Sequence, residues 1–373
     1  MPTAINENGG PRVDSIRVET YLIPTDGPES DGTFAWDKTT AVIVEAVAGG
    51  VTGLGYTYAD RATAVAIREA LAPVVIGQDA FATAAHYARM VGRVRNVGRA
   101  GIASMAISAV DVALWDLKAR LLGAPLAAVL GWAQPAIPIY GSGGFTSYGM
   151  DRLQRQLGDW AAAGLKFVKM KVGRDPAADP ERVRAARAAI GERVELFVDA
   201  NGAYARKQAL AMADRFAEAG VTWFEEPVSS DDLAGLRLVR DGVGGRMEVA
   251  AGEYGYDPFY FRRMLDAGAV DVLQADGTRC GGVTGLLSAQ ALADAHGMPL
   301  SAHCAPALHG HVGCALTRMR HVEYFYDHQR IEAMLFDGVP APRDGRLAPD
   351  PTRPGLGLVF KRQDAAKFAV DKS

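Results

Sequence analysis

The stretch Lys166–Gly173, KFVKMKVG, decides how the rest of the chain is interpreted. Its apolar residues and closing glycine predict a short buried strand, yet Lys169 and Lys171 lie inside it. Residues two apart in a strand point to the same face, so the two ammonium groups project side by side into one space. Burying adjacent cations is costly unless carboxylates lie opposite them. An edge strand with a solvated face is the ordinary explanation, and only carboxylates elsewhere in the chain favour a buried site.

The composition is that of an ordinary globular protein. The 373 residues are 49% hydrophobic and 22% charged, with a net charge of −3, which gives no indication of nucleic acid or an anionic membrane as a partner. The three cysteines, Cys280, Cys304 and Cys314, follow no disulfide or zinc-knuckle pattern. No apolar run is long enough to span a bilayer, and the opening stretch MPTAINENGGPR lacks the apolar segment of a signal peptide. We therefore expect a cytoplasmic protein.

Four parts of the chain differ in pattern. Residues 1–12 are polar and contain Gly and Pro, which predicts a flexible tail. Residues 13–133 hold three strand patterns followed by helical ones, an α+β unit, with a loop expected over Ile23–Trp36. Residues 134–331 alternate short apolar strands with amphipathic helices. Residues 332–373 are rich in Pro and Gly and are expected to fold back on the first unit.

The third part predicts eight strands whose starts lie roughly 20–30 residues apart, the repeat of a β/α unit. Short connections, and no G-x-G-x-x-G after any strand, favour a closed α/β barrel of the TIM type over an open doubly wound sheet. The predicted strands are Ile137–Tyr140, Phe167–Val172, Val194–Asp199, Thr222–Glu226, Glu248–Gly252, Val270–Gln274, Leu300–His303 and Val322–Phe325.

Barrel active sites lie at the carboxyl ends of the strands, and every strand from the second onward ends in an ionisable group. A single polar residue at a strand end is usually solvated surface, but seven consecutive strands with such an end are hard to explain by chance. The residues at these ends are Lys169, Lys171, Asp199, Asn201, Glu225, Glu226, Glu253, Gln274, Asp276, His303 and Glu323.

Three of these residues predict a metal site. Asp199, Glu225 and Glu253 come from neighbouring strands and would repel one another without a cation between them. Hard carboxylate oxygens without His or Cys favour Mg²⁺, with Mn²⁺ as the alternative, over zinc. We choose Glu225 as the ligand because Glu226 points the other way along the strand, where a helix-side ion pair is its ordinary role. One Mg²⁺ held in this way keeps positions open for a substrate carboxylate.

Two proton carriers flank this predicted site. A nearby cation and the neighbouring Lys169 lower the pKa of Lys171, which can then act as a base. His303 lies across the barrel, where Asp276 would accept a hydrogen bond from its ring and fix its tautomer; alone, His303 is most simply a core histidine. Together these groups are equipped to remove a proton alpha to a carboxylate, with Mg²⁺ and Lys169 stabilising the enediolate. Glu323, if protonated, could donate a hydrogen bond to the same oxygens.

These motifs resemble the enolase superfamily, and its mandelate racemase subgroup in particular, over nearly the whole chain. The resemblance implies a modified TIM barrel, (β/α)7β, with an N-terminal α+β capping domain, and a homo-oligomer between a dimer and an octamer. Order and spacing match as well as residue types. The matching motifs are KMK at 169–171, VDANG at 198–202, EEP at 225–227, GE at 252–253, QAD at 274–276 running into TRCGGVTG, SAH at 301–303 and HVEYF at 321–325.

The resemblance also implies roles for eight residues and for one bound Mg²⁺; the pairing of a Lys or His base with Mg²⁺ is known for this superfamily. By role, these are the Mg²⁺ ligands Asp199, Glu225 and Glu253, the acid/base groups Lys171 and the His303–Asp276 pair, and the substrate-carboxylate contacts Lys169 and Glu323.

Loops of the capping domain choose the substrate in this subgroup, here Ile23–Trp36 and the turn after Gly55. We expect Trp36 and Tyr56 from these loops, and Ser142 and Asn201 from the barrel, to contact a small-molecule carboxylate substrate. Most similar proteins resemble dehydratases of acid sugars, so the first hypothesis is Mg²⁺-dependent dehydration of an acid sugar to a 2-keto-3-deoxy acid. Racemisation or epimerisation at the same site is the alternative.

Two other classes of function stay open. The pattern His309-Gly310-His311 is found in metal-dependent hydrolases, although there it belongs to the first barrel strand and here it follows the seventh. It could equally lie at the start of a helix. A non-catalytic barrel that serves as a binding scaffold is the fourth hypothesis, and it requires that Lys171→Ala leave any activity intact.

Overall fold

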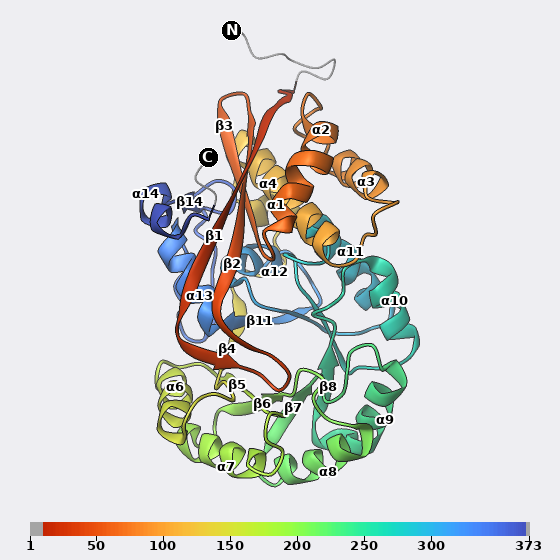
Figure 1. The fold of residues 1–373 in the computed structure, drawn as a ribbon, viewed down its shortest axis with the longest axis vertical. Coiled ribbons are helices and arrows are strands. Elements are labelled where there is room, and N and C mark those ends of the chain that lie inside the picture. The colour runs from red at the N-terminus through yellow and green to blue at the C-terminus, as the bar shows by residue number, and fades with distance from the viewer. Residues whose placement is uncertain (1–9, 371–373) are drawn as a thin grey trace.

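The computed structural model describes residues 10–370 (Figure 1). Nine of the twelve residues predicted as a flexible tail therefore lie outside the described residues, and Arg12 forms a β-bridge with Asp79. The described chain has an N-terminal antiparallel sheet packed on helices and a closed barrel of parallel strands. None of its helices is long and apolar enough to cross a bilayer.

Eight parallel strands form the barrel, which closes where β11 pairs with β4. One α-helix follows each of the first seven strands, so the predicted α/β barrel with an N-terminal α+β unit is confirmed. The strands are β4 (Ile137–Gly143), β5 (Phe167–Lys171), β6 (Glu195–Asp199), β7 (Val221–Glu225), β8 (Glu248–Ala251), β9 (Val272–Ala275), β10 (Leu300–Ala302) and β11 (Met319–Phe325), and the helices are α6 (Met150–Ala162), α7 (Asp179–Ile190), α8 (Arg206–Ala217), α9 (Leu233–Val243), α10 (Pro258–Asp266), α11 (Gly282–Ala295) and α12 (Pro306–Gly313).

The inside of the barrel is packed with aromatic side chains below its mouth. Phe197 of β6 and Trp223 of β7 stack with their ring centroids 5.1 Å apart, and Tyr140 of β4 lies 5.6 Å from Phe197. All three are at most 1% exposed. Large aromatic rings exclude water from the barrel axis, so the charged groups at the carboxyl ends of the strands meet water only from above.

The capping unit packs a three-stranded sheet against a long helix. Strands β1 (Val13–Ser30), β2 (Ala35–Ala48) and β3 (Val51–Tyr58) pair in sequence order, and α4 (Ile102–Leu121) lies against them. Gly53 makes this packing possible, because a Cβ there would lie 2.3 Å from the carbonyl oxygen of Ala113. The other helical segments of the unit are α1 (Ala62–Ala66), the π-helix Ile67–Leu71, α2 (Ala72–Val75), α3 (Thr83–Arg93) and α5 (Leu126–Leu130).

The expected loop over Ile23–Trp36 is wrong. Strand β1 continues to Ser30 and β2 begins at Ala35, so most of this stretch is a hairpin that reaches from the capping unit to the barrel mouth (Figure 1). Its Pro and Gly residues are tolerated because a register shift between Pro24 and Glu29 absorbs them. At the tip, a Cβ on Gly32 would lie 2.4 Å from the carbonyl oxygen of Ala200, so the hairpin rests on the strand ends.

The C-terminal residues lie against the capping unit. After α13 (Tyr326–Leu335), strand β12 (Phe336–Asp337) pairs with β14 (Val359–Phe360). The ring of Phe360 packs edge-on against Tyr21 of β1, with centroids 5.5 Å apart. The remaining elements are β13 (Arg346–Leu347), which pairs with β4, α14 (Arg362–Ala365), and two 3₁₀ helices, Gly244–Arg246 and Ala366–Phe368.

Candidate active site

Strand register aligns three charged residues at the barrel mouth. Lys171 of β5 pairs with Asp199 of β6, which pairs in turn with Glu225 of β7. The side chains therefore extend from one level of the barrel, and Lys171 Nζ donates to Asp199 Oδ2 at 2.5 Å. Glu253 follows β8, and one oxygen from each of the three carboxylates lies within 4.8 Å of the others. The three predicted metal ligands are thus brought together, and none is more than 3% exposed.

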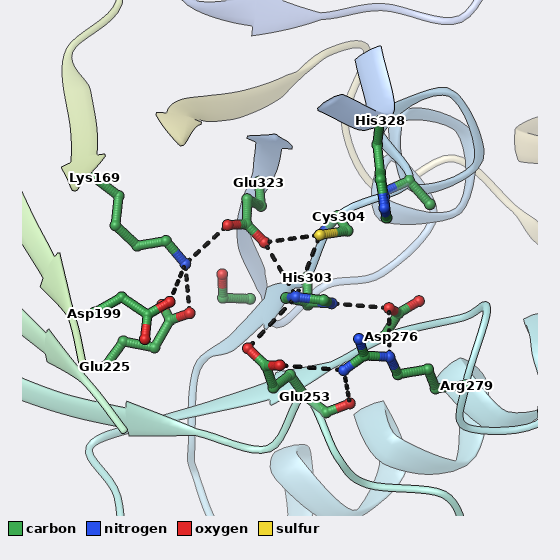
Figure 2. A network of polar contacts seen from close by, with 12 residues as sticks. Lys169, Asp199, Glu225, Glu253, Asp276, Arg279, His303, Cys304, Glu323 and His328 are labelled. Atoms are coloured by element: carbon green, nitrogen blue, oxygen red, sulfur yellow. Dashed lines mark hydrogen bonds and ion pairs between the residues drawn. The ribbon is translucent and has the colours of Figure 1, made fainter. Parts of the chain in front are cut away.

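The ammonium group of Lys169 lies between Asp199, Glu225 and Glu323 (Figure 2). Its Nζ contacts Glu225, and lies 2.8 Å from Glu323 Oε1 and 3.4 Å from Asp199 Oδ2. Strand β5 lies between β4 and β6, and the Lys169 side chain is fully buried. A solvated edge strand is therefore excluded, and the carboxylates expected opposite the two lysines are present.

Both lysines are held as ammonium ions in this arrangement. Burial on its own would lower the pKa of Lys171, but the carboxylate of Asp199 more than offsets it and the pKa is raised. The pKa of Lys169 is also raised, because Glu225 and Glu323 outweigh burial. The lower pKa expected for Lys171 therefore requires a cation that binds the carboxylates and neutralises their negative charge.

Glu323 does not meet the condition, protonation, under which it could donate a hydrogen bond to the substrate. Burial favours the neutral acid, but the ammonium group of Lys169 holds the pKa of Glu323 well below its usual range. Its Oε2 accepts the backbone N–H of Cys304 at 2.9 Å. Glu323 is therefore a carboxylate that accepts hydrogen bonds at this end of the barrel, and not a donor.

The position predicted for Glu226 is wrong. Strand β7 ends at Glu225, and Glu226 has a left-handed backbone with φ of +37°, so the strict alternation of a strand does not apply to it. Its side chain is 1% exposed. Burial and the charges of Glu253 and Asp199 raise its pKa, and its Oε1 has no hydrogen-bond partner in the part of the chain that the structure describes. Glu226 therefore belongs to the acidic cluster and forms no helix-side ion pair.

His303 and Asp276 form the expected pair on the other side of the mouth. His303 Nδ1 lies 2.8 Å from Asp276 Oδ2, while Asp276 Oδ1 accepts the backbone N–H and the hydroxyl of Thr278. The carboxylate therefore fixes the ring through Nδ1, while Nε2 lies beside Cys304 Sγ and the carboxylate of Glu253 at the wall of the cavity. Burial alone would lower the pKa of His303, but Glu253 and Glu323 raise it above its ordinary value.

Three further residues at the mouth were missed by the sequence predictions (Figure 2). Arg279 Nη1 lies 3.1 Å from Glu253 Oε1, and Arg279 Nε lies 3.6 Å from Asp276 Oδ2. Cys304 Sγ lies 3.2 Å from His303 Nε2. Cys304 is the residue after the predicted His303, and Arg279 lies three residues after the predicted Asp276, so each is close in sequence to a residue that the strand ends already indicated.

His328 is the third missed residue, and it comes from α13. Its ring stacks on Tyr58 of the capping unit with centroids 3.5 Å apart, and its Nδ1 accepts the backbone N–H of Ala305 at 3.3 Å. Burial lowers its pKa to about 3, so the imidazole is neutral. Because Nδ1 is an acceptor, the proton is on Nε2, which makes His328 a neutral donor toward the cavity. No sequence motif signalled it.

A cavity of about 530 Å³ opens above these groups. It is lined by both predicted proton carriers and by Trp36 and Asn201, whereas Tyr56 and Ser142 are absent from its lining. Tyr56 donates to Glu332 Oε1 at 2.7 Å and so joins the capping sheet to α13, which corrects its expected role as a substrate contact. Ser142 is buried in β4 opposite Lys169.

Within residues 10–370, His309 and His311 belong to no cluster of potential metal ligands. Both lie on α12. The backbone N–H of Gly277 donates to His309 Nε2 at 2.9 Å, and His309 Nδ1 lies 2.7 Å from the carbonyl oxygen of Cys304, so both ring nitrogens are used. His311 lines a different cavity beside the C-terminal residues. The pattern that suggested a hydrolase is therefore structural.

Two family models match most of the chain. The N-terminal domain model of mandelate racemase and muconate lactonizing enzyme matches residues 23–131, and a model described as enolase C-terminal domain-like matches residues 152–365. A mandelate racemase/muconate lactonizing enzyme-like protein from Rubrobacter xylanophilus is 57% identical, with a TM-score of 0.95 over 96% of this chain and 100% of that one. A racemase from Streptomyces coelicolor, solved with bound magnesium, is 31% identical, with a TM-score of 0.90 over 96% and 100%.

Several relatives are enzymes named for acid sugars. A 3,6-anhydro-alpha-L-galactonate cycloisomerase from Streptomyces coelicolor is 32% identical over 96% of this chain and 99% of its own length. An L-talarate/galactarate dehydratase from Salmonella typhimurium is 29% identical over 95% of this chain and 90% of its own.

Proposed function

This chain belongs to the mandelate racemase/muconate lactonizing enzyme family of the enolase superfamily, and we propose that it dehydrates an acid sugar to a 2-keto-3-deoxy acid. The family comprises enzymes, and relatives of this chain act on small acid-sugar carboxylates. One observation carries the proposal: Lys171 and His303 line the same cavity, over a cluster of three buried carboxylates.

The carboxylates suit a bound Mg²⁺, with Mn²⁺ as the alternative. Asp199, Glu225 and Glu253 converge, and the ammonium groups of the two lysines occupy the cation position beside them. Glu253 Oε2 is buried and has no hydrogen-bond partner among residues 10–370, so it is available as a ligand. The all-oxygen set matches one hard divalent ion per chain. Bound there, Mg²⁺ would polarise the substrate carboxylate and make its alpha proton more acidic.

The chain's own residues divide the proton transfers between them. Lys169 donates a hydrogen bond to the substrate carboxylate. Lys171 removes the alpha proton as a neutral amine, which it becomes when the negative charge of Asp199 is neutralised and no longer raises its pKa. His303, oriented by Asp276, protonates the beta hydroxyl as it leaves as water. Glu323 keeps Lys169 charged and in position. The enol that remains then ketonises to the 2-keto-3-deoxy acid.

Substrate contacts come from both domains. We propose that Trp36 of the hairpin and Asn201 after β6 contact the sugar chain, with His328 donating to one of its hydroxyls. The indole N–H of Trp36 is held by Glu29 Oε2 at 2.9 Å, so the ring presents its face and not its donor. Tyr56 and Ser142 are not proposed as contacts.

The proposal is tested by a mass-spectrometric screen of acid sugars with Mg²⁺. We expect at least one acid sugar to lose water and give a 2-keto product. The His303→Asn variant, run beside the wild-type enzyme, is expected to form none of this product. Turnover that gives no dehydrated product for any acid sugar, or a His303→Asn variant with full activity, would contradict the proposal.

Racemisation or epimerisation is the second candidate, because two proton carriers in one cavity can act on opposite faces of a carbon atom. An L-Ala-D/L-Glu epimerase from Clostridium acetobutylicum is 32% identical over 53% of this chain. Incubation in D₂O separates the two reactions. Incorporation of deuterium without a new keto acid supports epimerisation, whereas loss of water supports dehydration.

We also propose that the enzyme is a homo-oligomer. Several large apolar side chains are exposed among the described residues, including Val97 at 79% and Phe259 at 56%. Single exposed apolar side chains are ordinary surface, and they mark the place where subunits meet only where they gather into one patch. Size-exclusion chromatography with light scattering tests this proposal, and a monomeric mass would contradict it.

A further inference from the structure

Three side chains beside the carboxylate cluster form a second convergent group (Figure 2). His303 Nε2 and Cys304 Sγ are 3.2 Å apart, Cys304 Sγ and Glu323 Oε2 are 3.4 Å apart, and His303 Nε2 and Glu323 Oε2 are 3.7 Å apart. The three residues are at most 6% exposed. An imidazole nitrogen, a sulfur and a carboxylate oxygen thus face one point at the wall of the cavity.

These separations match the ligand sphere of a tetrahedral zinc ion. Zn–N and Zn–O bonds of about 2.0–2.2 Å and a Zn–S bond of about 2.3 Å place ligand atoms roughly 3.3–3.6 Å apart. The three observed distances, 3.2, 3.4 and 3.7 Å, lie within a few tenths of an ångström of that range. A thiophilic ion would therefore need little movement of the side chains.

The surrounding hydrogen bonds already hold the three ligands in place. His303 is fixed through its other nitrogen by Asp276, which is the carboxylate support that zinc-binding histidines usually have. The backbone N–H of Cys304 donates to Glu323 Oε2, and that oxygen keeps a second lone pair. Lys169 contacts the opposite oxygen, Glu323 Oε1, so it does not block the site.

The fourth ligand is Glu253 when Mg²⁺ does not hold that carboxylate, and otherwise a water from the cavity that His303 and Cys304 line. Glu253 Oε2 lies 3.4 Å from His303 Nε2 and is buried without a hydrogen-bond partner in the described chain. It points toward the same side of the imidazole (Figure 2). A buried carboxylate oxygen that lacks a donor is costly to keep, and an ion beside it removes that cost.

We propose that His303, Cys304 and Glu323 form a second metal site, which takes a thiophilic divalent ion such as Zn²⁺ and inhibits the enzyme when occupied. The thiol S–H bond breaks, a sulfur–metal bond forms and the proton passes to solvent. The ion then occupies His303 Nε2, so the imidazole can no longer transfer a proton. Sulfur and imidazole ligands select zinc over magnesium, whereas the all-oxygen cluster does not.

Cobalt is the probe for this site, because a cobalt–thiolate bond gives a near-ultraviolet charge-transfer band and an all-oxygen site gives none. Co²⁺ is added to the full-length protein in excess Mg²⁺, so that the carboxylate cluster is filled. We expect the band to appear in the wild-type protein and to disappear on addition of one equivalent of Zn²⁺. This readout needs no substrate, so it stands or falls separately from the proposed dehydration.

Cysteine variants assign the band. Cys304→Ser and Cys304→Ala should both lose it, while Cys280→Ser and Cys314→Ser, at buried cysteines away from the cluster, should retain it. Circular dichroism melting establishes that each variant is folded, and the two substitutions at Cys304 guard against failure of one of them. A wild-type protein without the band, or a folded Cys304 variant that retains it, overturns the proposal.

Once a substrate is known, inhibition provides the second measurement. Zn²⁺ in the presence of saturating Mg²⁺ should inhibit the wild-type enzyme, and a chelator should restore its activity. The concentration of Zn²⁺ for half inhibition should rise at least about tenfold in Cys304→Ser. An unchanged concentration would show that zinc inhibits elsewhere and would overturn the regulatory part of the proposal.

Discussion

The two sides of the barrel mouth differ in what holds their functional groups. On the side of β5 to β7, Lys171, Asp199 and Glu225 are the last residues of paired strands, so strand register alone sets their spacing. On the other side, His303 and Cys304 follow a strand of three residues, and Cys304 and the next residue have left-handed backbones. The first side is positioned by the sheet, the second by hydrogen bonds from neighbouring segments. The imidazole side should therefore depend more on supporting residues.

The largest expected effect comes from removing either proton carrier. Lys171→Ala and His303→Asn should each lower kcat by about 10²–10⁴-fold, because positioned proton transfer contributes about that much. Lys166→Ala, an exposed lysine beside the same strand, is the matched control and should change little. Turnover with the acid sugar from the screen is the measurement. Equal activity in Lys171→Ala and wild type would support a binding scaffold instead of an enzyme site.

The second largest effect is expected from Asp276, the residue that orients the His303 ring. Asp276→Asn keeps the shape of the side chain but removes the negative charge that orients His303, so kcat should fall by about 10²-fold. Thr278→Val, which removes only one donor to Asp276, should cause a smaller loss. The pH profile of kcat distinguishes positioning from a structural defect, since its limb for His303 should move to lower pH. An unchanged profile would contradict the assigned pairing.

A smaller effect on catalysis is expected from the hairpin tip, which covers both sides of the barrel mouth. Gly32→Val places a side chain against the carbonyl oxygens of Val172 and Ala200, so the tip must lift from the strand ends. We expect KM to rise about tenfold with a smaller change in kcat, since lids mainly bind and enclose the substrate. Gly149→Ala, where a Cβ would meet nothing within 4 Å, is the control. A change in kcat with an unchanged KM would contradict this expectation and would show that the hairpin tip acts in the chemical step.

The smallest effect concerns stability and α13, which carries His328. Burial raises the pKa of Glu332 to about 8, so between its ordinary pKa and pH 8 the folded protein holds a proton that the unfolded chain has lost. This contribution is present at low pH and is lost as pH rises toward 8. The free energy of unfolding of the wild-type protein should fall by at least about 1 kcal/mol between pH 5 and pH 8.

Denaturant unfolding at several pH values measures this dependence. Glu332→Gln cannot titrate and should lose that part of the slope, whereas Glu181→Gln, on the exposed face of α7, should keep it. Identical slopes in all three proteins would mean that Glu332 is charged in the fold and that Tyr56 donates to a carboxylate.

The difference between groups positioned by strand register and groups positioned by other contacts also explains which features could be predicted from the sequence. Period-two alternation and β/α spacing sufficed for the barrel and for Lys169, Lys171 and Asp199, because regular strands obey simple rules. Glu226 was misplaced because the strand ends one residue before it and its backbone is left-handed. The sequence predicts a loop at the hairpin because Pro and Gly are usual in loops, and only the pairing of β1 with β2 shows that its arms are strands. The contact of its tip with the barrel joins residues far apart in the chain.

Cys304 and His328 show the same limit at the site. Cys304 is next to a predicted residue, but a lone cysteine carries no pattern, and only the left-handed turn brings its sulfur to His303. His328 belongs to a helix, and its position depends on stacking with Tyr58 from the other domain. Tyr56, expected in the cavity, instead donates to Glu332.

The most direct test of the central claim, that Lys171 and His303 are two proton carriers on opposite sides of one bound substrate, is hydrogen exchange in D₂O. The substrate is an acid sugar analogue without the beta hydroxyl, which cannot lose water, offered as each of its two alpha epimers with Mg²⁺. By NMR, we expect Lys171→Ala to lose exchange of one epimer and His303→Asn to lose exchange of the other. Loss of the same epimer in both variants would show that the two groups do not face one another across the substrate.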